Sequence, residues 1–578
     1  MNLKIRFTML MLSICMTPAF AQNPPIPHLR AKGTTKQLIV NGKPFLVMGG
    51  ELHNSSTSSV SYMAPLWDKM KKKNLNTVIA PVYWEFLEPS QGKFDFTLVD
   101  SMILGARKHD LHLVLLWFGS WKNGYSMYTP EWIKDNSEKY PRAKDKEGNS
   151  YEMLSALNEQ SQNADAKAFK TLMHHIKVID SKYQTVIAMQ IENEMGLFGS
   201  PRDYGKVANE AYERGVPADL MKYLEGNKGK LQPELDSAWK ANGYKTSGSW
   251  ETVFGPSRFE KNDISVFSYL PEELFTVYHY AKYTGVVAAA GKSEYPIPMY
   301  VNCWIKQPGM FSSPGKYPSG GPTPHTLDLW RAEAPAIDFI SPDIYAPLKI
   351  ARSTMEQYHR SGNPLFIPEY RPGAQSSREA FWAYGQLDAI CFSPFGIDDT
   401  APEEDEITKT YEVLNLAKDQ ILENQGKGTM VGIYLDSADR EQQFDLNGYH
   451  IRAEFGGVSN AELANFSTGA KTKRAQVAGG LIIANGPNEF IVIGKDISFK
   501  LQPIAPDPKM PLFDVAFLDE GYFKNGKWIT TRRLNGDEGT GGADYGFGFM
   551  NTKTAYIKFQ RQKGDKYSLV RFKISKYN

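Results

Sequence analysis

The chain is poor in cysteine, and this limits what can hold it together. Its 578 residues contain three cysteines, of which Cys15 lies near the N-terminus, leaving Cys303 and Cys391 for the rest of the chain. Scaffolds that depend on disulfides are far richer in cysteine, so burial of apolar side chains must supply the stability. Cys303 and Cys391 both fall in apolar, strand-like runs, so we expect two buried free thiols.

Excess charge is also lacking. The formal net charge is +2, from 66 basic and 64 acidic residues, and charges of both signs are interspersed. A nucleic-acid-binding surface usually shows as a basic stripe, so we expect no nucleic-acid partner. Beyond the N-terminus no apolar run is long enough to cross a bilayer core of ~30 Å, so no membrane span is expected.

Metal-binding motifs are absent from the sequence as well. No His-Glu-x-x-His or Cys-x-x-Cys pattern occurs. His174 and His175 are adjacent on a helical stretch, where neighbouring side chains point about 100° apart, which is poor geometry for holding one ion. A metal enzyme is not indicated.

The N-terminal residues have the layout of a secretory signal. Lys4 and Arg6 precede an apolar run over 7–16, and Ala19-Phe20-Ala21 supplies a small-x-small site, so cleavage is expected after Ala21. A buried N-terminal helix is the less favoured alternative. Residues 12–15 loosely resemble a lipoprotein box, but the bulky Ile14 disfavours lipid anchoring. The sequence therefore predicts a signal peptide over 1–21 and a secreted or periplasmic protein.

The length calls for at least two cores, and the hydrophobic pattern divides accordingly. From about residue 36, short apolar strands alternate with helical patterns, which indicates parallel strands joined by right-handed crossovers. Eight such strands are expected, near 45–50, 76–80, 112–117, 185–189, 297–304, 337–345, 365–367 and 389–395. This is the pattern of a (β/α)8 TIM barrel over 22–425, with extra helices between the fourth and fifth strands.

After a last helix over 406–424 the pattern changes. Short alternating strands separated by Gly, Asn and Asp dominate from residue 426 to the end. This spacing is typical of an antiparallel β-sandwich, so the sequence predicts a C-terminal sandwich domain over 426–578.

Two predicted barrel strands run from apolar residues directly into a carboxylate. The fourth reaches Glu194 through Glu192 and Asn193, and the seventh reaches Glu369. Reacting groups of such barrels lie at the C-terminal strand ends, and strands four and seven face each other across the mouth. Glycoside cleavage needs one carboxylic acid and one carboxylate on opposite sides of the sugar, ~5–5.5 Å apart when the anomeric configuration is retained.

The alternative is that each is a solvated loop residue, which is the usual fate of a lone glutamate after a strand. A pair at these two strand ends weakens that alternative. Alternation along the strand does not choose between Glu192 and Glu194, since both would point the same way. Glu194 is the further toward the mouth, which favours it. The pKa of the acid must be raised by apolar surroundings and by its neighbouring carboxylate.

Several motifs together resemble glycoside hydrolase family 35. They are Ile191-Glu192-Asn193-Glu194-Met195-Gly196 on strand four, Asn76-Thr77-Val78 with Trp84, Glu88-Pro89 and Gly92-x-Phe94-Asp95-Phe96 around strand two, Pro130-x-Trp132 after strand three, and Pro368-Glu369-Tyr370 on strand seven. The resemblance covers about residues 36–425. It implies Glu194 as acid/base, Glu369 as nucleophile, and Asn193 as partner of the sugar 2-hydroxyl.

The resemblance also implies an exo-acting retaining β-galactosidase from a bacterial branch of the family associated with plant cell-wall polysaccharides. Two departures from the family pattern leave the identity of the sugar open. This chain reads Pro81-Val82-Tyr83-Trp84-Glu85 where the family usually has Tyr before Val-x-Trp-Asn, and Ser120 stands where the family has Glu before Trp.

Other strand ends supply candidates for substrate contact, each with a structural alternative such as loop solvation, helix capping or core packing. They are Glu51, His53, Asn54, Trp84, Glu85, Trp121, Asn123, Asn302, Trp304 and Tyr345. Trp304 is a possible platform for a sugar ring. The Tyr345 hydroxyl is placed to hold Glu369 in its charged form, since a hydrogen bond to a carboxylate stabilises the charge.

Three hypotheses remain from the sequence: a β-galactosidase, a retaining glycosidase for another sugar such as a glucosidase or arabinosidase, and a carbohydrate-binding protein without catalysis. The first two need only side chains, so neither a cofactor nor a metal is expected. The expected partner is an oligo- or polysaccharide substrate, and the oligomeric state is left open.

Overall fold

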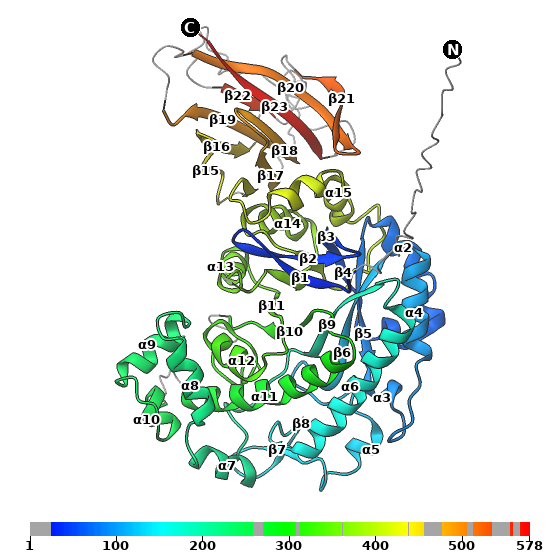
Figure 1. Cartoon of the computed structure of the whole chain (residues 1–578), viewed down its shortest axis with the longest axis vertical. Helices are drawn as coiled ribbons and strands as arrows, with labels where there is room; N and C mark the ends of the chain where they lie inside the picture. Colours follow the sequence, from blue (N-terminus) through cyan, green and yellow to red (C-terminus); the bar gives the residue numbers. More distant parts are fainter. Residues whose placement is uncertain are drawn as a thin grey trace, which may run out of the picture.

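The structure is a computed structural model that describes residues 25–257, 270–307, 312–360, 362–436, 438–455, 477–505, 512–534, 555–558 and 567–577. The predicted signal peptide over 1–21, with Cys15, lies outside the described residues. Figure 1 shows two stacked bodies, with the N-terminal barrel below and the C-terminal strands above it.

Eight parallel strands close into a barrel, as predicted. Its strands, in chain order, are β4 (Val47–Glu51), β5 (Thr77–Tyr83), β6 (His112–Lys122), β9 (Val186–Asn193), β10 (Met299–Trp304), β11 (Phe339–Ile344), β12 (Phe366–Tyr370) and β13 (Cys391–Pro394), and β13 pairs with β4 to complete the ring. The residues in them are buried almost throughout, because helices cover the outside and side chains fill the inside.

The helices that cover the barrel follow the helical patterns of the sequence. They are α2 (Leu66–Lys72), α4 (Thr97–Lys108), α6 (Glu159–Asp180), α11 (Leu270–Glu294), α12 (Leu327–Glu333), α13 (Leu348–Tyr358), α14 (Ala374–Gln386) and α15 (Glu406–Asn424). Shorter elements lie in the loops: η1 (Ser56–Ser58), α1 (Val60–Met63), α3 (Trp84–Leu87), α5 (Glu131–Lys134), the hairpin β7 (Arg142–Lys144) and β8 (Ser150–Leu154), and η2 (Pro324–Thr326). The long segment between β9 and β10 contains the extra helices α7 (Lys206–Glu213), α8 (Ala218–Gly226), α9 (Pro233–Ala241) and α10 (Trp250–Phe254).

A small N-terminal sheet closes one end of the barrel and was not predicted. It consists of β1 (His28–Lys32), β2 (Thr35–Val40) and β3 (Lys43–Phe45), all antiparallel. Leu38 and Val40 of β2 join the apolar cluster inside the barrel, together with Val47, Ile79 and Phe366. The sheet therefore seals the end at which the barrel strands begin, and leaves the other end for a site.

The C-terminal part is a two-sheet sandwich, as predicted. One sheet has the order β14-β17-β18-β23-β20-β21 and the other β15-β16-β19-β22, with antiparallel pairing. The strands are β14 (Met430–Leu435), β15 (Glu441–Leu446), β16 (Tyr449–Phe455), β17 (Ala478–Ala484), β18 (Glu489–Lys495), β19 (Ile497–Pro503), β20 (Leu512–Lys524), β21 (Lys527–Arg533), β22 (Ala555–Lys558) and β23 (Ser568–Tyr577).

Strands β14, β17 and β18 of the six-stranded sheet are buried on both faces, because one face packs on the second sheet and the other on α14 and α15. In β14, Val431 and Ile433 point into the sandwich core, whereas Met430 and Tyr434 join the core of the barrel. In the view of Figure 1 these two helices lie directly under the sandwich. The sandwich and the barrel thus share one apolar interface.

Two further expectations can be compared with the described residues. Cys303 and Cys391 are both buried and free, as predicted. Among the described helices, none has the length and apolar character needed to cross a membrane.

Candidate functional site

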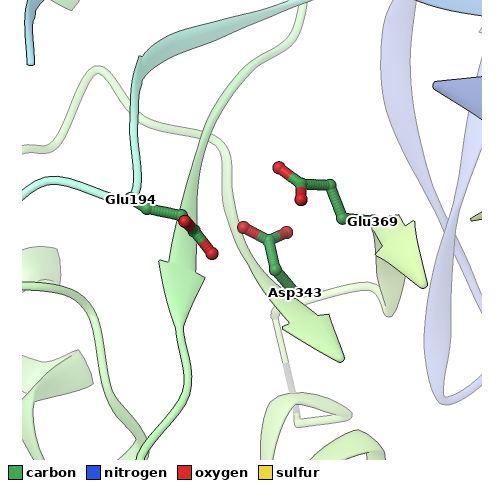
Figure 2. A group of neighbouring side chains, drawn as sticks. All are labelled: Glu194, Asp343 and Glu369. Atoms are coloured by element: carbon green, nitrogen blue, oxygen red, sulfur yellow. The ribbon is translucent and has the colours of Figure 1, made fainter. Parts of the chain in front are cut away.

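The two predicted carboxyl groups meet at the open end of the barrel. Glu194 follows β9, and Glu369 lies near the end of β12. Together with Asp343 of β11 they form a group in which one oxygen of each residue lies within 4.8 Å of the others. Figure 2 shows the three side chains turned toward one another from three different segments. Asp343 was not predicted as a site residue.

The backbone at the end of strand four is unusual, and it separates Glu192 from Glu194. Glu192 and Glu194 have φ values of 59° and 44°, a region that non-glycine residues rarely occupy. The pairing of β9 with β6 also shifts register between Trp117 and Lys122. Such backbone costs of order 1–3 kcal/mol per residue, and functional sites are places where it is retained.

This irregularity makes the prediction from strand alternation wrong. The Glu192 carboxyl accepts a hydrogen bond of 2.7 Å from the Trp121 backbone N–H and interacts with Asp165 of α6, whereas Glu194 reaches Asp343 and Glu369. The two glutamates therefore point to different places, and Glu194 is the one in the group.

Glu369 receives three hydrogen-bond donors. The Tyr345 hydroxyl donates to its Oε2 at 2.8 Å, and the amide nitrogens of Asn193 and Asn302 donate to its Oε1 at 3.2 and 3.4 Å. Burial, and then the charge of Glu369, raise the pKa of the Tyr345 hydroxyl, so this hydroxyl keeps the proton that it donates. These donors stabilise Glu369 as a carboxylate, the form that a nucleophile requires.

Glu194 has the surroundings of an acid. Its side chain is only 5% exposed, and the Asn302 amide oxygen accepts from its backbone N–H at 2.8 Å. Burial first, and then the Glu369 charge, raise the pKa of Glu194 to about 8. A carboxyl group with that pKa still carries its proton at neutral pH.

Two further buried carboxyls, Asp343 and Glu51, adjoin the pair. Asp343 accepts from the Asn302 amide at 2.6 Å, and burial raises its pKa well above the usual range. Glu51, at the end of β4, is 0% exposed, and burial followed by the charge of Glu369 likewise raises its pKa. Lys122 offsets part of this negative charge, and it donates to the Asn193 amide oxygen at 2.9 Å.

Carboxyl groups this close together would also suit a cation by spacing alone. Amide and hydroxyl groups of Asn193, Asn302 and Tyr345 donate to both Glu369 oxygens and to one Asp343 oxygen, which leaves fewer lone pairs for an ion. The residues present fit a group that shares protons.

Several predicted substrate contacts lie near this group. Glu51 adjoins Glu369, and Asn123 lies beside the group, with its backbone N–H donating to the Asn193 carbonyl at 3.0 Å. The His53 ring packs against Phe395 and is 2.8 Å from an Asp399 oxygen. The Asn54 carbonyl accepts from Tyr83, and its side-chain oxygen is buried with no hydrogen-bond donor among the described residues.

Trp304 lies at the end of β10 in an aromatic group at the rim. Its ring meets that of Phe198 edge-on with centroids 5.4 Å apart, and Phe198 stacks on Tyr125 at 5.7 Å. Tyr125 is 39% exposed. Tyr125, Phe198 and Trp304, which we call the rim aromatics, come from the segments after strands three and four and from the last residue of strand five.

Three of the predicted substrate contacts have a packing or surface role instead. Trp84 is 0% exposed, packs against Trp132, and donates to Glu88 at 2.9 Å. Glu85 pairs with Lys134 at 3.4 Å on the surface of α3. Trp121 is 0% exposed between Tyr280 and Tyr283. These contacts place all three in packing or surface roles.

Sequence reasoning missed Asp343 and Lys122. Asp343 carried a usable signal, because a carboxylate inside the apolar run of β11 is as costly as those of strands four and seven. Lys122 carried none, since lysines are common in loops. Ser120, at the departure from the family pattern, is buried and donates to Asp165 at 2.6 Å, so it belongs to the layer that holds Glu192.

The structure is thus an eight-stranded barrel with a pair of buried carboxyls at its open end. Residues 37–263 match the sequence model described as glycosyl hydrolases family 35, and residues 407–545 match a domain of unknown function (DUF5597). The resemblance predicted from the motifs is thereby confirmed over residues 37–263, which are similar to family 35. The second match begins within α15, so it includes the helix that joins barrel and sandwich.

Two curated relatives match the same part of the chain. A β-galactosidase of Xanthomonas manihotis is 26% identical over 203 residues, which cover 34% of this chain and 31% of the relative. The human β-galactosidase-1-like protein 3 is 27% identical over 202 residues, covering 33% and 28%. The match thus spans about a third of these relatives' length.

Solved structures with a partly similar backbone fold share little sequence with this chain. A β-galactosidase from Bacillus circulans sp. alkalophilus has a TM-score of 0.43 at 16% identity, covering 65% of this chain and 57% of that one. The catalytic domain of a β-amylase from Paenibacillus polymyxa has a TM-score of 0.44 at 13% identity, covering 66% and 98%.

Proposed function

We propose that this chain is a retaining glycoside hydrolase, and specifically an exo-acting β-galactosidase that removes terminal galactose from plant or dietary glycans. The observation that carries the proposal is the meeting of Glu194 and Glu369, whose oxygens lie within 4.8 Å at the barrel mouth. That separation favours direct attack by a carboxylate over attack by an interposed water, because an inverting enzyme needs a wider gap of ~6.5–9.5 Å. The galactose assignment rests on the names of the relatives.

The proposed reaction has two steps. Glu194 gives its proton to the glycosidic oxygen while a Glu369 oxygen bonds to the anomeric carbon, and the aglycone leaves as an alcohol. Glu194, now a carboxylate, takes a proton from water, whose oxygen bonds to the anomeric carbon as the bond to Glu369 breaks. Both carboxyls return to their starting states, and the sugar keeps its configuration.

The surroundings of each carboxyl support these roles. The donors on Glu369 stabilise the charge of an attacking and leaving carboxylate. The raised pKa of Glu194 keeps it protonated for the first step. The side chains of Glu194 and Glu369 are 5% and 4% exposed, so little water competes with them. We also propose, from residues 1–21, that the protein is exported to the periplasm or the exterior.

A panel of nitrophenyl glycosides tests the proposal. Hydrolysis of the β-galactoside above all others supports it, whereas preference for a β-glucoside or an arabinoside points to a related glycosidase of other specificity. NMR of the first-formed sugar should show the β-anomer, and an α-anomer would exclude the retaining mechanism. No turnover of any glycoside would favour the carbohydrate-binding alternative.

The nucleophile is tested by Glu369→Gln, which should abolish turnover of the preferred glycoside while leaving the thermal unfolding profile intact. The matched control is Glu131→Gln, the same change at an exposed glutamate of α5, which should retain full activity. If Glu369→Gln keeps most of the activity, another group is the nucleophile.

A further inference from the structure

Glu51 is a buried carboxyl at the end of strand one that the proposed mechanism does not use. Its backbone is fixed, because its carbonyl accepts from the Ile397 N–H at 3.0 Å and its strand pairs with β5 and β13. Its side chain is 0% exposed. Among the described residues, no N–H or hydroxyl group donates to either of its carboxyl oxygens. A charged carboxylate in that position would be buried without compensation.

The neighbour of the Glu51 carboxyl is the Glu369 carboxyl, which lies within hydrogen-bonding reach. Two carboxyl groups can form a hydrogen bond only when one of them holds a proton. Glu369 already accepts from the Tyr345 hydroxyl and from two amides, and these donors favour its charged form. Glu51 has no such donors, so the proton belongs on Glu51.

We propose that Glu51 is a positioning residue: a neutral carboxylic acid that donates a hydrogen bond to Glu369 and holds the nucleophile in its charged, oriented form. The proposal rests on the proposed function of Glu369 as nucleophile. Glu51 would then be a fourth hydrogen-bond donor to the Glu369 carboxylate. It lies on strand one, whereas the other three donors lie at the ends of strands four, five and six.

The groups that face Glu51 agree with a neutral acid. The charges of Glu369 and Glu194 disfavour a negative charge on Glu51, whereas the charge of Lys122 favours one. Lys122 is directed to the Asn193 amide oxygen at 2.9 Å. Three groups on neighbouring strands also lie close enough to interact electrostatically with Glu51. They are Tyr300 of β10, Asp343 of β11 and Cys391 of β13. Burial is the largest cause that raises the pKa of Glu51.

A rival role for Glu51 is a charged acceptor for a sugar hydroxyl. The two roles require opposite protonation states, so infrared spectroscopy separates them without any turnover. The difference spectrum of wild type minus Glu51→Gln at pH 7 should contain the C=O band of a protonated carboxylic acid. Carboxylate bands in that spectrum would overturn the proposal, whether or not the protein hydrolyses glycosides.

Kinetics of two variants of similar size then test the positioning role. Glu51→Gln keeps a donor toward Glu369, whereas Glu51→Met fills the space without one. We expect kcat/KM of Glu51→Met to be roughly 10- to 150-fold below that of Glu51→Gln, the range for a hydrogen bond to a charged group. The acid limb of the pH–kcat/KM profile should move to higher pH in Glu51→Met only, because its nucleophile is more easily protonated.

The outcomes of these experiments separate a failure of the positioning role of Glu51 from a failure of the proposed glycosidase function. Equal losses in Glu51→Gln and Glu51→Met, with unmoved acid limbs, would show that Glu51 acts only through packing or charge and would overturn the positioning role. A wild type that is inactive on every glycoside while its infrared spectrum shows protonated Glu51 would instead overturn the proposed function and leave the protonation of Glu51 established.

Discussion

At the scale of single residues, the site gathers four buried carboxyls, Glu51, Glu194, Asp343 and Glu369. The Lys122 ammonium offsets the negative charge of Glu51 and Glu194 only in part, so protons must supply the remaining compensation. A glycosidase needs one neutral and one charged carboxyl a few ångströms apart, and the uneven distribution of amide and hydroxyl donors provides that difference.

The first prediction concerns the pH dependence of Glu194. The acid acts only when protonated, so kcat/KM should be level below its pKa and fall about tenfold per pH unit above a pH of about 8. Initial rates on the preferred aryl glycoside between pH 5 and 10 measure this limb. An alkaline limb that persists unchanged in Glu194→Ala would assign it to another group.

Leaving-group dependence gives an independent check on the same residue. Glu194→Ala should slow glycosides with poor leaving groups by about 10²–10⁴-fold, because those need protonation of the departing oxygen. Dinitrophenyl glycosides, whose leaving group departs without a proton, should lose far less in the glycosylation step. Equal loss on both kinds of substrate would contradict the acid role.

The carboxyls could be predicted from the sequence only where a simple rule applied to them. Glu194 and Glu369 stood out because each ends an apolar strand, and Asp343 satisfied the same rule without being recognised. The separation of Glu192 from Glu194 depends on two residues with positive φ and a register shift. A prediction from strand alternation assumes a regular backbone, so it cannot anticipate such a change.

At the scale of elements, the strand ends carry the site and the segments after them shape its rim. The Asn123 N–H binds the Asn193 carbonyl, and Leu197 pairs with Ser319 in a short bridge. A side chain at Gly124 would collide with Phe198, at 2.8 Å from the added Cβ. The segments that carry the rim aromatics are therefore packed tightly together on the Glu194 side of the mouth.

The second prediction concerns Trp304 as a surface for the aglycone. In the proposed mechanism Glu194 protonates the leaving oxygen, so a ring on its side of the site would contact the departing group rather than the cleaved sugar. Trp304→Ala should raise KM for a galactosyl oligosaccharide by about 2- to 10-fold, the worth of one aromatic contact. Methyl β-galactoside has no ring in its leaving group and should show an unchanged KM. A similar rise for both would mean that Trp304 supports the cleaved sugar or the fold.

The elements themselves were largely predictable, because eight apolar strands alternating with helices leave few arrangements other than a barrel. The closing sheet β1–β3 was not. Its strands are short and mostly polar apart from residues 38–40, and what they cover becomes apparent only once the barrel end exists. The role of this sheet depends on its contacts with the barrel rather than on the hydrophobic pattern of its own strands.

At the scale of the whole molecule, the sandwich is a continuation of the barrel core. Polar contacts reinforce the apolar interface: Glu406 of α15 accepts from Tyr567 at 2.9 Å and pairs with Arg378 of α14 at 3.4 Å and with Lys495 of β18 at 3.8 Å. The alternating pattern predicted a sandwich, but the burial of its second face against the helices follows only from the assembled structure.

The third prediction tests this continuity through the close approach of β14 to α14. Gly432 lies so near the helix that an added Cβ would be 2.5 Å from the Trp382 Cα and 2.7 Å from the Phe381 carbonyl oxygen. Both are backbone atoms that cannot rotate away, so Gly432→Ala must displace the strand from the helix. Overpacking of this kind costs about 1–3 kcal/mol of unfolding free energy.

Urea unfolding followed by tryptophan fluorescence measures that loss. The matched control is Gly226→Ala at the end of α8, where an added Cβ meets no atom within 4 Å, and it should leave the free energy unchanged or slightly raised. If the sandwich and barrel form one cooperative unit, Gly432→Ala shifts a single transition to lower urea, and activity and fluorescence are lost together. A separate early transition with full activity retained beyond it would show instead that the barrel is stable without the sandwich.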